Sequence, residues 1–171
     1  MTAETRSPRV PFEAVVTEHG ATVYRVCRAL LPPADADDAW SETFLSALRA
    51  YPDLRPDSNV RGWLVTIAHR KAIDQHRRIA RAPRPSDRLE DSAATDPTPS
   101  GADDAALRDA LDALPPKQRG AVVARYLADL AYADVAAMLG CSEDAARRSA
   151  ADGIAALRRT YGAAHGMETD R

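Results

Sequence analysis

A dense group of basic side chains closes one predicted helix, and its chemistry is that of phosphate binding. The stretch RKAIDQHRRIAR, residues 70–81, carries Arg70, Lys71, Gln75, His76, Arg77, Arg78 and Arg81. Clustered arginine and lysine are the electrostatic footprint of a nucleic-acid contact, because they neutralise phosphates and release counterions. A basic helix end can also simply complement the helix dipole. The pattern therefore indicates a phosphate-binding surface, with dipole compensation as the alternative.

A second nucleic-acid signal lies near the C-terminus, in YADVAAMLGCSEDAARRSAADGIAALRR, residues 132–159. Placing Gly140 at a turn puts Ser142 at the N-cap of the last helix, and it turns small and apolar residues inward: Val135, Ala136, Leu139, Cys141, Ala146 and Ala150. This spacing predicts a helix-turn-helix, and an ordinary helical hairpin is the alternative. Arg147 and Arg148 are the only bases in the first three turns of its second helix, and an arginine can hold a guanine edge with two hydrogen bonds.

The second helix of this motif also contains acids. Arg148 lies four residues from both Asp144 and Asp152, so part of its charge is expected to be neutralised within the helix. Because acids on this side repel phosphates, we predict that they limit indiscriminate DNA binding by the free protein. The alternative is that both aspartates merely solubilise an alanine-rich helix.

The elements that must position these residues are helical. Apolar residues recur at helical spacing along most of the chain and no strand alternation is evident, so the predicted fold class is all-α. Predicted helices cover residues 11–31, 35–51 and about 58–81, with prolines after the first two. In the second helix, Trp40, Phe44 and Leu48 form the predicted core stripe. Trp63 is also assigned to the core, with stacking on a base as the alternative. His69 and His76 are expected on the surface or facing DNA.

Composition divides the chain into two predicted domains. A helical domain covers residues 10–81, and a flexible linker rich in Pro, Ser and Asp covers residues 82–102. The second domain, residues 103–161, begins with a helix over 103–113 and continues through a helix started by Pro115 and Pro116 to the helix-turn-helix. Residues 162–171 form a tail.

Overall composition excludes several classes of protein. The chain has 171 residues, 45% hydrophobic, which is enough for real cores, and its net charge of −2 argues against a uniformly basic nucleic-acid binder. Without an apolar N-terminal run or a long apolar stretch, we expect a cytoplasmic protein with no membrane contact. Cys27 and Cys141 have no partner at metal-binding spacing, and catalytic motifs are absent. We expect no enzymatic activity, catalytic residue, metal or cofactor.

Three stretches carry a family resemblance. DADDAWSETFLSALRAYP and RGWLVTIAHRKAIDQHRR resemble the second conserved region of bacterial extracytoplasmic-function (ECF) sigma factors, and ALPPKQRGAVVARYLADLAYADVAAMLGCSEDAARR resembles their fourth. The order and spacing of these stretches distinguish this family from other helix-turn-helix regulators. The resemblance implies a promoter-specificity subunit of RNA polymerase with two helical domains on a flexible linker. Its implied partners are core RNA polymerase, promoter DNA and an anti-sigma factor.

The resemblance also implies roles for individual residues. The helix of the ETF motif is expected to bind core polymerase through one mixed polar and apolar face: Asp38, Glu42, Leu45 and Arg49. The third helix and the loop before it, which could form a pocket for an unstacked base, are expected to hold the −10 element through Arg55, Asn59, Arg70, Lys71, Gln75, Arg77 and Arg78. Expected contacts to the −35 element come from Ser142, Arg147 and Arg148.

The sequence departs from the family pattern in two places, in the third helix and in the last helix. Arg70 stands where the family usually has asparagine, and Ala145 and Ala146 replace a usual threonine and valine.

A one-component regulator binding operators as a dimer is one alternative function, which would need a ligand pocket or dimer helix in the N-terminal half. A nucleic-acid-processing enzyme is the other, and no metal-binding group of acids supports it.

Overall fold

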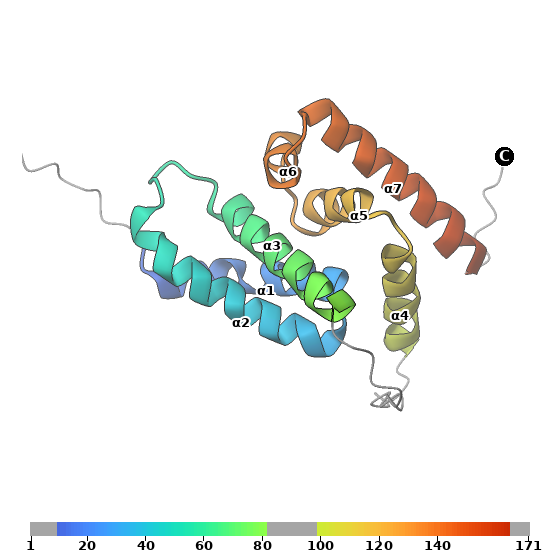
Figure 1. Cartoon of the computed structure of the whole chain (residues 1–171), viewed down its shortest axis with the longest axis horizontal. Coiled ribbons are helices and arrows are strands. Elements are labelled where there is room, and N and C mark those ends of the chain that lie inside the picture. The colour runs from blue at the N-terminus through green and yellow to red at the C-terminus, as the bar shows by residue number, and fades with distance from the viewer. Residues whose placement is uncertain (1–9, 82–98, 165–171) are drawn as a thin grey trace, which may run out of the picture.

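The computed structural model describes residues 10–81 and 99–164, and these contain helices and connecting turns with no strand. The predicted all-α fold class is confirmed. Figure 1 shows α1, α2 and α3 side by side, with α5, α6 and α7 gathered beyond α3. The elements, in chain order, are α1 (Phe12–Leu30), α2 (Pro33–Ala50), the 3₁₀ turn η1 (Tyr51–Asp53), α3 (Val60–Arg81), α4 (Pro99–Asp112), α5 (Pro116–Val122), the π-helical turn η2 (Val123–Leu127), α6 (Tyr132–Leu139) and α7 (Glu143–Ala164).

Prolines and one asparagine set the helix boundaries of the N-terminal half. Pro33 occupies the first position of α2, where its missing N–H costs no hydrogen bond, so α2 begins two residues before the predicted start at Asp35. At the start of α3, the Oδ1 atom of Asn59 accepts a hydrogen bond of 3.1 Å from the backbone N–H of Gly62. This side-chain cap places the start of α3 where the sequence predicts it.

Aromatic packing fixes α1 against α2. The ring of Phe12 lies edge-on to Phe44 at 6.4 Å and to Tyr51 at 5.3 Å between centroids. Trp40 packs against Phe44 and donates its indole N–H to the carbonyl oxygen of Gly20 at 3.0 Å. Trp63 packs against the same core, as predicted. Leu48 does not: it is 50% exposed, so its assignment to the core stripe is wrong.

The C-terminal half contains the predicted helix-turn-helix in α6 and α7. Gly140 ends α6 with φ 64°, a left-handed conformation that favours glycine, and α7 follows after two residues. Val135, Ala136, Ala146 and Ala150 are buried, as predicted. Leu139 and Cys141 are only half-buried, and Met138 is the buried residue of that turn instead.

The two halves contact each other. One cluster of buried residues extends from α1 through α3 to α7, and α1 contacts η2 while α3 contacts α6. Of the predicted linker, residues 82–98 lie outside the described residues, and residues 99–102 belong to α4. The division into two domains on a flexible linker therefore stays a prediction. Within the described parts of the chain, every helix is too short or too polar to cross a membrane.

Candidate nucleic-acid and protein interfaces

The C-terminal half of α3 presents part of its basic cluster to solvent. Arg70, Arg77 and Arg78 are exposed, whereas Lys71 and Gln75 are half-buried. Arg77 pairs with Asp74 one turn earlier, 3.8 Å between nitrogen and oxygen. An exposed pair of this kind contributes little to stability, so its arginine can be released to a phosphate at small cost.

The two half-buried residues of this cluster hold α3 against α2. The ammonium group of Lys71 lies 3.5 Å from the carboxylate of Glu42, and the amide of Gln75 donates to Asp35 at 3.1 Å. Lys71 was predicted to bind DNA and Glu42 to bind polymerase, and the structure pairs them with each other. Because this ion pair joins α3 to α2, Lys71 and Glu42 also stabilise the fold.

Of the two histidines of α3 that were predicted to lie on the surface, His76 is exposed and His69 is not. His69 is buried, 8% exposed, so its assignment to the surface is wrong; its ring packs on Gly120 of α5 so closely that a Cβ there would lie 2.9 Å from Nε2. Burial, with a smaller contribution from the charge of Arg70, lowers the pKa of His69 from its ordinary value of 6.5. His76 is exposed but is joined through Nε2 to the carbonyl oxygen of Leu30 at 2.8 Å.

Arg55 and Asn59, the two predicted DNA contacts in the loop before α3, have different surroundings. Arg55 forms a two-bonded pair with the carboxylate of Asp57, at 3.2 and 3.0 Å, and this hydrogen-bonded partner lowers the pKa of Asp57. Both residues are exposed. Asn59 instead faces the C-terminal half, where its Nδ2 atom donates to Asp134 of α6 at 2.9 Å.

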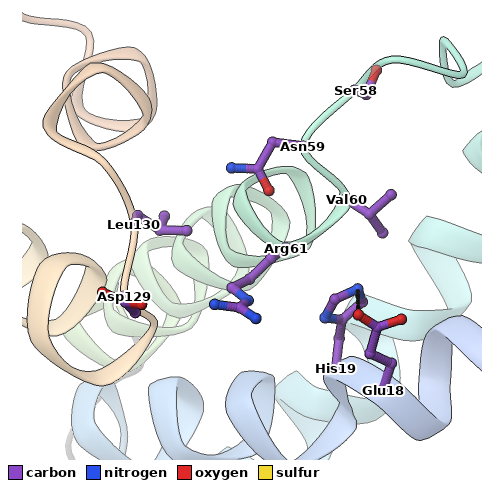
Figure 2. Close-up of a pocket in the computed structure, with 8 residues that line it drawn as sticks. All are labelled: Glu18, His19, Ser58, Asn59, Val60, Arg61, Asp129 and Leu130. Atoms are coloured by element: carbon purple, nitrogen blue, oxygen red, sulfur yellow. Dashed lines mark ion pairs between the residues drawn. The ribbon is translucent and has the colours of Figure 1, made fainter.

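A polar cavity of about 380 Å³ lies where this loop meets the C-terminal half. Figure 2 shows its lining: Glu18, His19, Ser58, Asn59, Val60, Arg61, Asp129 and Leu130. The Arg61 side chain extends into the space between Asp129 and the Glu18–His19 pair. Burial is the main cause that lowers the pKa of His19. Only Ser58 and Asn59 of the predicted base-binding loop reach this cavity, and Arg55 does not.

The exposed face of α2 combines charge with apolar surface. Asp38, Leu45 and Arg49 are exposed and Glu42 is half-buried. Leu45 is 54% exposed, and Leu48, one turn further along, adds a second exposed leucine to this face. Sequence reasoning missed Leu48, although its spacing of three from Leu45 places both on neighbouring positions of one helix surface.

The helix-turn-helix presents α7 through a side-chain cap. The Ser142 hydroxyl accepts a hydrogen bond of 3.2 Å from the backbone N–H of Ala145, as predicted for an N-cap. Arg147 and Arg148 are both exposed. Arg147 bonds Glu143 at 2.8 Å. The expected pairing of Arg148 with aspartates one turn away is not seen: within the described residues, the ion pair of α7 is the one between Glu143 and Arg147.

Comparison with known proteins identifies the family of the chain. Family models match twice: Sigma-70 region 2 over residues 15–82 and Sigma-70, region 4 over residues 104–157. The chain is 34% identical over 164 residues to the ECF RNA polymerase sigma factor SigM of Mycobacterium tuberculosis, covering 95% of this chain and 83% of that protein.

Two solved structures share the fold. CnrH in complex with the cytosolic domain of CnrY has a TM-score of 0.70 at 24% identity, over 89% of this chain and 88% of that one. RpoE in complex with the anti-sigma factor NepR from Bartonella quintana has a TM-score of 0.71 at 19% identity, over 94% and 98% of the two chains. Proteins of this family are generally non-enzymatic DNA-binding regulators. With both sigma-70 regions present in order and a relative of this similarity, the chain belongs to the ECF sigma factors, which direct promoter-specific transcription initiation.

Proposed function

We propose that this sigma factor divides its work among three surfaces. The exposed face of α2 binds core RNA polymerase, the loop before α3 and the basic end of α3 hold the −10 element, and α7 reads the −35 element. The observation that carries this proposal is the exposure of Arg70, Arg77 and Arg78 in the C-terminal half of α3, in the same chain as the capped helix α7. Two separate DNA-facing surfaces suit a protein that contacts two promoter elements.

The polymerase contact rests on the composition of the α2 face. Leu45 and Leu48 are exposed apolar side chains, and Asp38 and Arg49 add both signs of charge on the same helix. An apolar centre with a charged rim is the usual anatomy of a protein interface. Glu42 lies at the edge of this polymerase-binding face. Its carboxylate is already paired with Lys71 of α3.

The −10 contact rests on charge and position. Arg70, Arg77 and Arg78 bind phosphates, while Lys71 and Gln75 line the same helix and support its packing. Arg55 and Asn59 contact the strand from the loop. For Asn59 this requires release from Asp134, to which it is bonded when the two halves lie together.

The −35 contact rests on α7. Ser142 fixes the start of the helix, and Arg147 and Arg148 supply the donors for base edges or phosphates. With few bases, this helix alone binds DNA weakly. Linkage to a second DNA contact and to polymerase compensates, because a tethered site acts at a high effective concentration.

The proposed role as a sigma factor also implies where the protein works, whether it is an enzyme and which further partner it has. We infer that the chain has no catalytic activity and works in the cytoplasm, where RNA polymerase acts. An anti-sigma factor is a candidate partner, supported by the solved relatives that were captured with CnrY and NepR. Operator binding as an independent regulator is not favoured.

Reconstitution with purified core polymerase tests the proposal. Core enzyme with and without the full chain is given a library of promoter fragments, and transcript start sites are mapped by sequencing. We expect new start sites that share two upstream elements at a fixed separation. Initiation at the same sites with core enzyme alone, or no initiation with the chain added, contradicts the proposal.

A further inference from the structure

Arg147 does not stand free on the surface of α7. Its guanidinium carbon lies 4.6 Å from the centroid of the Tyr132 ring, and its Nη2 atom donates to Glu143 at 2.8 Å. Tyr132 belongs to α6, so the stack crosses the turn of the helix-turn-helix. The side chain nevertheless remains 56% exposed. One face and one nitrogen are thus engaged, and other N–H groups of the guanidinium remain available.

Tyr132 is also contacted from η2, the turn that precedes the helix-turn-helix. The guanidinium carbon of Arg125 lies 5.2 Å from the same ring centroid. Arg125 is fixed in turn, because its Nη1 atom donates to the carbonyl oxygen of Leu130 at 3.1 Å and lies 3.4 Å from the carboxylate of Asp129. Arg125 and Arg147 therefore share one aromatic ring, and Arg125 is anchored to backbone.

The π-helical turn η2 places these groups together. Its widened turn is closed by the backbone N–H of Ala128 bonding the carbonyl oxygen of Val123 at 3.2 Å. A π turn shifts the helix register by one residue, and such turns often occur at functional sites. Tyr126 is exposed on this turn, and its neighbour Tyr132 raises the pKa of Tyr126. The Tyr132 ring is therefore contacted by two guanidinium groups, those of Arg125 and Arg147.

We propose that Tyr132 is a positioning residue for promoter recognition: its ring, held by Arg125, orients the guanidinium of Arg147 toward one base of the upstream element. A long arginine side chain normally samples many rotamers, and ordering it on binding costs free energy. Stacking on a fixed ring removes much of that cost in advance, as cation–π contacts do. This explains how a helix with so few bases can discriminate. The inference rests on the proposed function, because Arg147 must be the base-reading residue.

The test uses the reconstituted holoenzyme and a promoter library randomised through the upstream element. Initiation frequencies are compared for the wild type and for Arg147→Ala, Tyr132→Leu, Tyr132→Phe and Arg125→Ala. We expect Arg147→Ala to relax the preference at one base position. Tyr132→Leu should relax the same position about three- to tenfold, Arg125→Ala should do so more weakly, and Tyr132→Phe, which keeps the ring face, should restore the preference.

The outcomes separate this inference from the proposed function. If Tyr132 only stabilises the fold, Tyr132→Leu should reduce initiation equally at all base positions and lower the melting temperature, and phenylalanine should not rescue it. That result overturns the inference. Relaxation at a position different from that of Arg147→Ala overturns it as well. If wild-type holoenzyme initiates selectively but Arg147→Ala changes no preference, Arg147 is not the reader and the inference fails alone. If wild-type holoenzyme initiates nowhere, the proposed function fails first.

Discussion

Asn59 and Asp134, which are far apart in sequence, are joined by a hydrogen bond of 2.9 Å between the two halves of the molecule. The same Asn59 side chain caps α3 through its other atom, which accepts from Gly62 at 3.1 Å. One amide therefore has a structural bond within its own half and a bond across the interface. When the halves lie together, the predicted DNA contact of Asn59 is occupied by a carboxylate of α6.

Removing the carboxylate of Asp134 should loosen the contact between the halves. An exposed hydrogen bond of this kind contributes about 1 kcal/mol, so Asp134→Ala should raise the population of separated forms by up to about fivefold. We would measure distances between spin labels at Glu13→Cys and Arg159→Cys, in a Cys141→Ser background. Asp144→Ala, an exposed substitution on α7, is the control. Identical distance distributions in Asp134→Ala and wild type would show that this bond does not hold the halves.

The α2 face makes a prediction about polymerase binding. Leu45→Asp introduces a charge at a side chain that is 54% exposed, so it should weaken copurification with core polymerase at least tenfold while leaving the melting temperature nearly unchanged. Combining it with Glu42→Arg should abolish binding. Ile79→Asp is the matched control, because Ile79 is an apolar residue of α3 that is 46% exposed. Equal loss of binding in both variants would argue against a specific docking face on α2.

The basic end of α3 makes a prediction about salt. Arg77→Ala combined with Arg78→Ala removes two exposed cations, so promoter complexes should weaken for every sequence tested. The slope of log affinity against log salt should flatten by about 1 to 2, as expected for two lost phosphate contacts. Titrations of holoenzyme on two unrelated promoters at several salt concentrations measure this slope. A loss confined to one promoter would indicate base readout instead.

Helix periodicity predicted the elements well because each stripe, cap and proline acts within a few residues. The start of α3 and the turn at Gly140 follow from local signals of this kind. The contacts of the predicted site residues could not be predicted as well, because their partners come from distant parts of the chain. Nothing near Lys71 in sequence indicates that it meets Glu42, and nothing near Asn59 indicates Asp134.

His69 illustrates the same limit. The sequence predicted it on the surface, whereas the close approach of Gly120 from α5 buries it. Only a glycine leaves room for the ring at that crossing, and the sequence gives no local sign that the two residues meet. The π-helical turn η2 was likewise not predicted, since helical periodicity distinguishes poorly between one α and one π turn.

Burial of His69 makes stability depend on pH. The neutral imidazole is favoured in the folded protein, which lowers its pKa from 6.5, so the unfolded chain binds more protons as the pH falls below that value. Stability should therefore decrease from pH 7.5 to 5.5. His69→Asn should reduce this dependence, measured as the difference in melting temperature between the two pH values. His19, whose pKa is also lowered, should account for part of the remainder. An unchanged difference in His69→Asn would contradict the assignment.

The acids of α7 give the last prediction. Asp144 and Asp152 are exposed on α7, and within the described residues neither forms an ion pair, so each presents an unneutralised charge to an approaching phosphate backbone. Asp152→Ala should tighten binding of the full chain to random duplex DNA about two- to fivefold at low salt, and the gain should disappear as salt screens the repulsion. Fluorescence anisotropy at several ionic strengths measures this directly. Ala151→Ser, an exposed and uncharged change beside it, should leave the affinity unaltered. If Asp152→Ala binds random DNA no more tightly than wild type at low salt, the aspartates serve only to keep an alanine-rich helix soluble.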